Sequence, residues 1–162
     1  MDKHVRLELK TEVKELNKVV GFVENICDQH NIYNNYFGNI VTAVSEAFLN
    51  AVEHGNKKDI SKNISLDFEV INDGFTFCIS DQGLGFDTNS IIDPTELNLD
   101  KEIQGKGIFL MKSLSDGLEF RNNGAQVCLK FKISSINKEM ADARVVKLKS
   151  FIKSTITQNS LN

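Results

Sequence analysis

Glu46, Asn50 and His54 are spaced four residues apart in an otherwise apolar segment. Their side chains, a carboxylate, a carboxamide and an imidazole, are of types that can take part in binding or catalysis. On an α-helix, side chains at i, i+4 and i+8 lie along one stripe. The core-facing positions of this helix would be Ile40, Val41, Val44, Ala47, Phe48, Ala51 and Val52. The polar stripe then borders the apolar face, where side chains line a half-buried pocket and cost free energy unless something satisfies them.

The stripe alone does not identify its chemistry. A carboxylate, a carboxamide and an imidazole on one side of a helix are compatible with a metal site, with a buried hydrogen-bond network or with no function. The favoured interpretation of His54 is a hydrogen-bonding residue at the helix end, and that of Glu53 is a surface residue. A ligand for the stripe has to be indicated elsewhere in the sequence.

A first glycine motif, Asp81-x-Gly83-x-Gly85, lies where a predicted strand becomes a loop. Glycines at such a point let the backbone approach a flat ligand closely and adopt dihedral angles that other residues avoid. An aspartate just before them can accept a hydrogen bond from an exocyclic amine. By itself the motif is weak, since two nearby glycines after a strand usually form only a turn.

A second glycine motif, Gly105-Lys106-Gly107, stands at the predicted start of a helix. Free backbone N–H groups and the positive helix end attract phosphate there, and the Lys106 ammonium adds charge. The motif is neither a Walker loop nor a dinucleotide-binding fingerprint. It is also weak when taken alone.

Together, in this order and spacing, the three motifs resemble the ATP site of the GHKL (Bergerat-fold) ATPase superfamily, over roughly Val5 to Ile133. Among its branches the chain is most similar to the stand-alone anti-sigma-factor serine/threonine kinases. The similarity rests on Glu-Ala-x-x-Asn-Ala-x-x-His at 46–54, Asp-x-Gly-x-Gly-Phe-Asp at 81–87, and Gly-Lys-Gly-Ile-Phe-Leu-Met at 105–111 followed by Asp116. The short chain, without sensor or phosphoacceptor domains, agrees with that branch.

The resemblance implies roles for the polar residues. Asn50 would ligate Mg²⁺ through its amide oxygen, a hard ligand of the kind that this ion prefers. Glu46, one helical turn away, would act as general base and accept the proton of the attacking hydroxyl. Asp81 would read the adenine amino group. His54 would be structural support.

The resemblance also implies roles for the glycine motifs. Gly83 and Gly85 would let the adenine ring pack against backbone. Gly105 and Gly107 would present N–H groups to the phosphates, and Lys106 would steady the transferring group. Related kinases often have arginine in place of this lysine, so a point-charge contact is kept while a bidentate one is lost. Residues 88–104 would form a lid that orders around the nucleotide.

Three functions remain open at this stage. The favoured one is an ATP- and Mg²⁺-dependent serine/threonine protein kinase that is also an anti-sigma factor and phosphorylates a serine of an antagonist protein. The alternatives are a non-catalytic, ATP-dependent partner-binding module and a simple GHKL ATPase. All three need Asn50 and Asp81, whereas only the enzymes need Glu46. The resemblance further implies protein partners, namely a sigma factor and its antagonist, and a homodimer.

The elements that position these residues follow from the hydrophobic period, since alternation predicts strands and a period of 3.6 predicts helices. The predicted strands are 4–10, 64–70, 75–79, 118–121 and 127–133, with turns at 72–74 and 122–124. The predicted helices comprise one after an N-cap at Thr11, one over about 39–54 ending at Gly55-Asn56, one over about 107–115, and a tail from about Asn137.

Consecutive hairpins imply a mixed, largely antiparallel sheet with helices on one face, which is a two-layer α/β (α+β) sandwich. The ATP site would lie between the helices and the lid. We expect one ATP-binding domain over 1–135 and a helical tail over 136–162 that is not a separate domain. The tail is interpreted as a packing or dimer element.

Composition narrows the class of protein. The chain has 162 residues, 41% of them hydrophobic, and a formal net charge of -3, which fits one globular domain. Its Lys and Arg residues are scattered, which argues against direct nucleic-acid binding as the main role. No apolar run approaches a membrane span, so a cytoplasmic protein is expected. Cys27, Cys78 and Cys128 are expected to be buried free thiols.

Overall fold

The structure is a computed structural model, and it describes residues 3–32, 35–88 and 102–134, together with 142, 145, 146, 148 and 149. Its centre is a five-stranded sheet with the strand order β1-β2-β3-β5-β4. All neighbouring strands are antiparallel. The strands are β1 His4–Lys10, β2 Asn63–Ile71, β3 Gly74–Ser80, β4 Gly117–Arg121 and β5 Gln126–Lys132.

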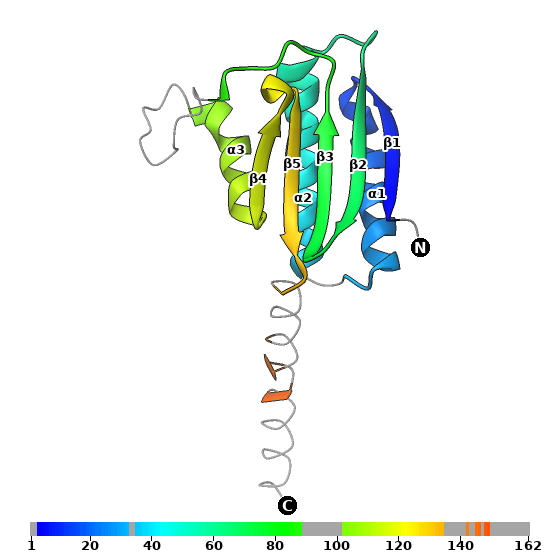
Figure 1. The fold of residues 1–162 in the computed structure, drawn as a ribbon, viewed down its shortest axis with the longest axis vertical. Coiled ribbons are helices and arrows are strands. Elements are labelled where there is room, and N and C mark those ends of the chain that lie inside the picture. Colours follow the sequence, from blue (N-terminus) through cyan, green and yellow to red (C-terminus); the bar gives the residue numbers. More distant parts are fainter. Residues whose placement is uncertain are drawn as a thin grey trace, which may run out of the picture.

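Helices cover one face of this sheet, so the predicted two-layer α/β sandwich is confirmed. The helices are α1 Leu16–Gln29, α2 Asn35–Asn50 and α3 Glu102–Leu114. Figure 1 shows α1 and α2 behind the sheet and α3 beside the edge strand β4. None of the helices that the structure describes is both long enough and apolar enough to cross a membrane.

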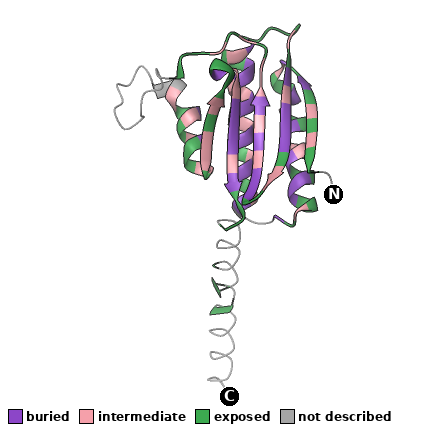
Figure 2. Ribbon diagram, in the orientation of Figure 1, coloured by how far each residue is buried: buried purple, intermediate pink, exposed green. Residues whose placement is uncertain are grey.

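The core lies between α1, α2 and the inner face of the sheet. In register across the central strands, Phe68 faces Phe77 and Phe77 faces Leu129, and all three side chains are completely buried. The helices contribute equally buried side chains from positions three or four residues apart, which are Val19, Val23, Ile40, Ala43, Val44, Ala47 and Phe48. Figure 2 shows this alternation as bands of buried residues along β2, β3 and β5. The predicted periods therefore located the core.

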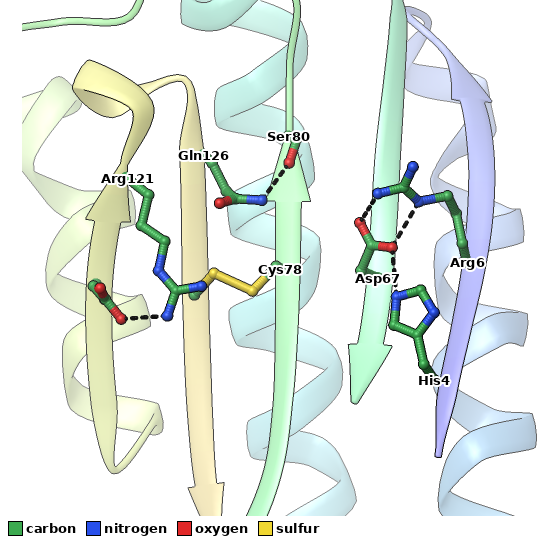
Figure 3. Close-up of a disulfide and its surroundings, with 9 residues drawn as sticks. His4, Arg6, Asp67, Cys78, Ser80, Arg121 and Gln126 are labelled. Carbon is green, nitrogen blue, oxygen red and sulfur yellow. Dashed lines mark hydrogen bonds and ion pairs between the residues drawn. A yellow bond between two sulfur atoms is a disulfide. The ribbon is translucent and has the colours of Figure 1, made fainter. Parts of the chain in front are cut away.

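The outer face of the sheet carries polar side chains instead. Asp67 on β2 accepts hydrogen bonds from the Arg6 guanidinium at 2.7 and 2.9 Å and lies 3.0 Å from Nε2 of His4. Both partners belong to the edge strand β1, and Figure 3 shows them converging on the carboxylate. A two-pronged arginine contact of this kind fixes the edge strand to its neighbour.

The structure corrects the expectation for two of the cysteines. Cys78 on β3 and Cys128 on β5 face each other in register and form a disulfide, with a Cα–Cα distance of 4.1 Å (Figure 3). The expectation of free thiols was wrong for this pair because 50 residues separate them in sequence, and only the strand order brings them together. Cys27 is the free, buried thiol, and burial raises its pKa to about 12.

Three predicted helix starts are also wrong. The segment after β1 begins with a 3-10 turn at Val13–Glu15 and has no side-chain N-cap bond, because the hydroxyl of Thr11 donates to the carbonyl oxygen of Lys62 at 2.7 Å. The second helix, α2, begins at Asn35 and not near 39. The third, α3, begins at Glu102 and not near 107.

Two other predictions fall on residues that are only partly described. Residues 89–101 of the predicted lid lie outside the described residues. So does most of the predicted tail, in which residues 142, 145, 146, 148 and 149 are helical and exposed.

We predict that mass spectrometry after alkylation in denaturant will find one reactive thiol before reduction and three after it. The chain has three cysteines, two of which are joined. Replacing Cys78 and Cys128 together by serine should lower the free energy of unfolding by about 2–4 kcal/mol, since the bond closes a long loop in the unfolded chain. Three reactive thiols in unreduced protein would show that the disulfide is absent.

Candidate functional site

Two predicted site residues on α2 converge on a glycine of α3. Glu46 and Asn50 are both half-buried, as a stripe at the margin of the apolar face requires. A Cβ placed on Gly107 would lie 3.1 Å from Oε2 of Glu46 and 3.2 and 3.3 Å from the amide atoms of Asn50. Gly107 therefore lets α3 approach α2 at the point where a carboxylate and a carboxamide meet.

The polar stripe ends at Asn50. Directly after it the helix widens into a π-helix over Ala51–Gly55, which ends with the Asn56 N–H bonded to the Ala51 carbonyl oxygen at 2.8 Å. The change of period removes His54 from the stripe that a continuous α-helix would have formed, and His54 is exposed. Single π-helical turns occur mostly inside α-helices and often at functional sites.

The third predicted polar residue, Asp81, lies at the end of this π-helix. A Cβ on Gly55 would overlap the Asp81 carboxylate, and a Cβ on Gly83 would overlap the carbonyl oxygen of Gly55. Gly55 was predicted as a helix-termination signal, but the left-handed residues after the helix are Lys57 and Lys58, with φ of 54° and 60°. Gly55 is thus needed for the close approach of the Asp81 loop, a role that sequence reasoning missed.

The backbone of the loop after β3 is held at successive amides. The Asp81 N–H donates to the carbonyl oxygen of Ala125 at 3.0 Å. The next amide, Gln82, donates to Oδ1 of Asn56 at 2.8 Å. The Gly83 N–H then bonds to Oδ1 of Asp81 itself, also at 2.8 Å. The loop is therefore formed in the protein alone, before any ligand is added.

Gly85 makes a close contact within the protein that was not predicted for it. It has a φ of +74°, which favours glycine, and a Cβ on it would overlap the carbonyl oxygen of Asn123 in the β4–β5 turn. The same oxygen accepts the Phe86 N–H at 2.8 Å, and the Phe86 ring packs edge-on against Phe120 at 5.3 Å. Gly85 thus lets the loop after β3 pack closely on the β4–β5 turn, and its predicted contact with the adenine ring stays a prediction.

The electrostatic state of Asp81 follows from its half-buried position. Burial raises the pKa of this carboxyl, and the Gly83 N–H and the nearby Lys62 offset only part of that effect. A carboxylate in such a place is short of solvent and has one oxygen, Oδ2, that the loop amide does not bind. It is well suited to accept a hydrogen bond from an amino group of a ligand.

The second glycine motif lies inside α3 and not in front of it. Because α3 begins at Glu102, its first four N–H groups without helical partners end at Gly105, where a side chain would meet open space. Gly107 lies beyond them and contributes close packing, as described above. Lys106 is exposed. Of the motif, Gly105 and Lys106 remain the residues whose position suits an anion.

A separate hollow of about 450 Å³ lies on the other side of α3, towards β4. None of the predicted site residues lines it. Its walls are Ile108, Lys112, Ser115, Asp116, Gly117, Leu118 and Phe120.

Comparisons with known proteins agree with the motifs. A family model described as a histidine kinase-like ATPase domain matches residues 9–132. An anti-sigma F factor from Clostridium beijerinckii is 30% identical over 60% of this chain and 72% of its own length. A protein named serine-protein kinase RsbW from Staphylococcus epidermidis is 37% identical over 60% of this chain and 64% of its own.

A solved structure shares the fold. The crystal structure of the RsbU and RsbW domains of Rv1364c from Mycobacterium tuberculosis matches 81% of this chain with a TM-score of 0.53 and 14% sequence identity. The chain covers 32% of that solved chain. At this identity the likeness concerns the arrangement of helices and strands alone.

We predict that Asp81→Asn will stabilise the ligand-free protein near neutral pH. Because the folded-state pKa of Asp81 is raised, its contribution to stability is present below the unfolded-state pKa and is lost as the pH rises through the folded-state value. The variant, which stays neutral, should therefore exceed the wild type in thermal midpoint at pH 7 and match it at the lowest pH at which both stay folded.

Asp59→Asn is a matched control, because the pKa of Asp59 is shifted in the opposite direction from that of Asp81. Hydrogen bonds from Ser61 lower the pKa of Asp59, so its contribution is present at neutral pH and lost as the pH falls. This variant should have a lower thermal midpoint than the wild type at pH 7. Equal midpoints for wild type and Asp81→Asn across the whole pH range would contradict the assignment of a desolvated carboxylate.

Proposed function

Because the chain belongs to the histidine kinase-like ATPase domain family, we propose that it is an ATP- and Mg²⁺-dependent serine/threonine protein kinase that acts as an anti-sigma factor. Its protein substrate would be an antagonist that carries the acceptor serine, and its target a sigma factor. The relatives named anti-sigma F factor and serine-protein kinase RsbW support this choice within the family.

The observation that carries the proposal is the meeting of Glu46 and Asn50 at Gly107, with Asp81 fixed at the far end of the same helix. At one end of the site, the Asp81 carboxylate can accept a hydrogen bond from an amine. At the other end, the side-chain oxygen atoms of Glu46 and Asn50 lie close to α3 and can bind a metal ion. A nucleotide has this polarity, with an amino group on its base and anionic phosphates at the opposite end.

At the base end, the Asp81 carboxylate would accept a hydrogen bond from the adenine amino group. Its position over Gly55 and its bond to the Gly83 N–H keep it from rotating away. A side chain on Gly83 would overlap the carbonyl oxygen of Gly55, so the loop can take this position only with glycine there. The adenine ring would pack against the backbone at Gly83 and Gly85.

At the phosphate end, the chemistry of the donors fits Mg²⁺. Asn50 would hold the ion through its amide oxygen, at the place where a Cβ on Gly107 would intrude. When bound, the ion would neutralise charge on the phosphates. Gly105 and Lys106 would add an N–H group and a positive charge.

Glu46 would act as general base. The serine oxygen of the substrate attacks the γ-phosphorus, the bond from that phosphorus to the β–γ bridging oxygen breaks, and ADP leaves. The serine proton passes to the Glu46 carboxylate, one helical turn from Asn50.

Two alternatives use the same site: an ATP-dependent binding module without transfer, and an ATPase in which Glu46 activates water. The presence of Glu46 beside Asn50 favours an enzyme over a binding module. Our proposal also includes the domain boundaries 1–135 and 136–162, a homodimer and a cytoplasmic location.

We predict that calorimetry will show Mg²⁺-dependent ATP binding that Asp81→Asn weakens about 10- to 100-fold, the usual range for a lost hydrogen bond to a charged group. In the variant the amide oxygen would keep the Gly83 N–H, so its NH₂ group would face the adenine amine. Asp59→Asn serves as the control and should bind as the wild type does. Unchanged affinity in Asp81→Asn would remove Asp81 from the base site.

We also predict that wild-type protein with γ-labelled ATP and Mg²⁺ will label a small protein in a lysate of its source organism. Glu46→Gln should abolish the label while ATP affinity stays within about threefold, since a general base acts in the transition state and not in binding. Phosphoserine should be found in the labelled protein. Tight ATP binding without any transfer by the wild type would favour the binding module, and release of free phosphate alone would favour the ATPase.

A further inference from the structure

Asn56 is a buried polar residue that takes no part in the reaction proposed above. It follows the π-helical segment directly and is only 1% exposed. A buried carboxamide costs free energy unless its donors and its acceptor are bonded. Its bonding partners therefore indicate its role.

The Asn56 side chain joins the ends of three strands to the end of the π-helix that follows α2. Its oxygen accepts the backbone N–H of Gln82, which follows β3, at 2.8 Å. Its nitrogen donates to Oγ1 of Thr11, which follows β1, at 2.8 Å, and to the carbonyl oxygen of Asn63, which begins β2, at 3.0 Å. All of its amide groups thus have partners.

The bond to Gln82 acts directly on the loop that carries Asp81. Gln82 is exposed as a residue, and the Asn56 side chain supplies the partner of its backbone N–H. The preceding amide, Asp81, is held from the opposite side by Ala125 at 3.0 Å. Two consecutive amides fixed from two sides leave the Asp81 carboxylate little freedom over Gly55.

We propose that Asn56 is a positioning residue of the nucleotide site, which keeps the Asp81 carboxylate in register with Glu46 and Asn50. The inference rests on the proposed function, since it takes Asp81 as the acceptor of the adenine amino group. Asn56 sits at the end of the same continuous helix that carries Glu46 and Asn50. Its bond to the loop therefore sets the distance between the base end and the phosphate end of the site.

Base selectivity follows from the same bond. Guanine has a carbonyl oxygen where adenine has an amine, and a carboxylate at that place attracts the amine and repels the oxygen. A displaced Asp81 would lose much of both effects. Loss of the Asn56 bond should therefore weaken ATP binding and also reduce the preference for ATP over GTP.

The test compares Asn56→Ala with Thr11→Val, measured by calorimetry with ATP and with GTP. Thr11→Val removes the hydroxyl on the other side of the Asn56 amide but keeps the bond to Gln82. It removes two hydrogen bonds, the one to Lys62 and the one from Asn56, and leaves the loop after β3 untouched. Both variants should have lower thermal midpoints than the wild type.

We expect Asn56→Ala to weaken ATP binding about tenfold and to lower the ATP-to-GTP affinity ratio, while Thr11→Val keeps both at wild-type values. A purely structural role would predict that the two variants change together or not at all. Wild-type affinity and base preference in folded Asn56→Ala would overturn the proposal. If Asn56→Ala does not fold, Asn56→Ser, which shortens the side chain but keeps it polar, takes its place with the same expected result.

A second measurement needs neither a variant nor a nucleotide. Amide hydrogen exchange of the ligand-free wild type, read by NMR, should show the Gln82 amide protected although its residue is exposed and lies outside the strands. Fast exchange at Gln82 would overturn the proposal even if ATP binds. A wild type that binds no ATP but protects Gln82 would instead overturn the proposed function, and with it the role in base selectivity.

Discussion

Close approach of backbones at the end of α2 is the constraint on which the site depends. The loop after β3 comes nearer to the π-helix after α2 than side chains at Gly55 or Gly83 would allow, and α3 comes so close to α2 that a Cβ on Gly107 would require Glu46 and Asn50 to move by a few tenths of an ångström. Each glycine faces a different group: the Asp81 carboxylate, a backbone carbonyl, or the pair Glu46 and Asn50. Close packing of this kind transmits small changes, so a methyl group on Gly55 would displace the Asp81 carboxylate, one on Gly83 would displace the carbonyl of Gly55, and one on Gly107 would shift Glu46 and Asn50 slightly.

The same closeness imposes an electrostatic cost. Asp81 is removed from part of its solvent, which opposes its ionised state, and the loop supplies only one amide in return. A site arranged for stability alone would place a neutral residue there. Functional sites commonly hold groups that are unfavourable in the empty protein and become satisfied when the ligand binds.

The sequence predicted the strands, the core positions of α2 and the pairing of Glu46 with Asn50, because those depend on periods within one segment. It did not predict what depends on contacts between segments. The Cys78–Cys128 disulfide and the hydrogen bond from the Asn56 amide to the Thr11 hydroxyl both join residues that are distant in sequence. The π-helix over Ala51–Gly55 has no local signature, since its residues fit an α-helical pattern equally well, and Gly55-Asn56 gave the usual sign of a helix end.

The disulfide has a consequence for the order in which the sheet comes apart. Cys78 lies on the strand that leads into the Asp81 loop, and Cys128 lies on the strand that follows Ala125, the partner of the Asp81 amide. The adjacent strands β3 and β5 are therefore cross-linked close to the base of the loop, whereas, in the part of the chain that the structure describes, the edge strands β1 and β4 each pair with one strand. The cross-link opposes the separation of β3 from β5, so we expect local opening of the sheet to begin at its edge strands and to reach the strands below the Asp81 loop last.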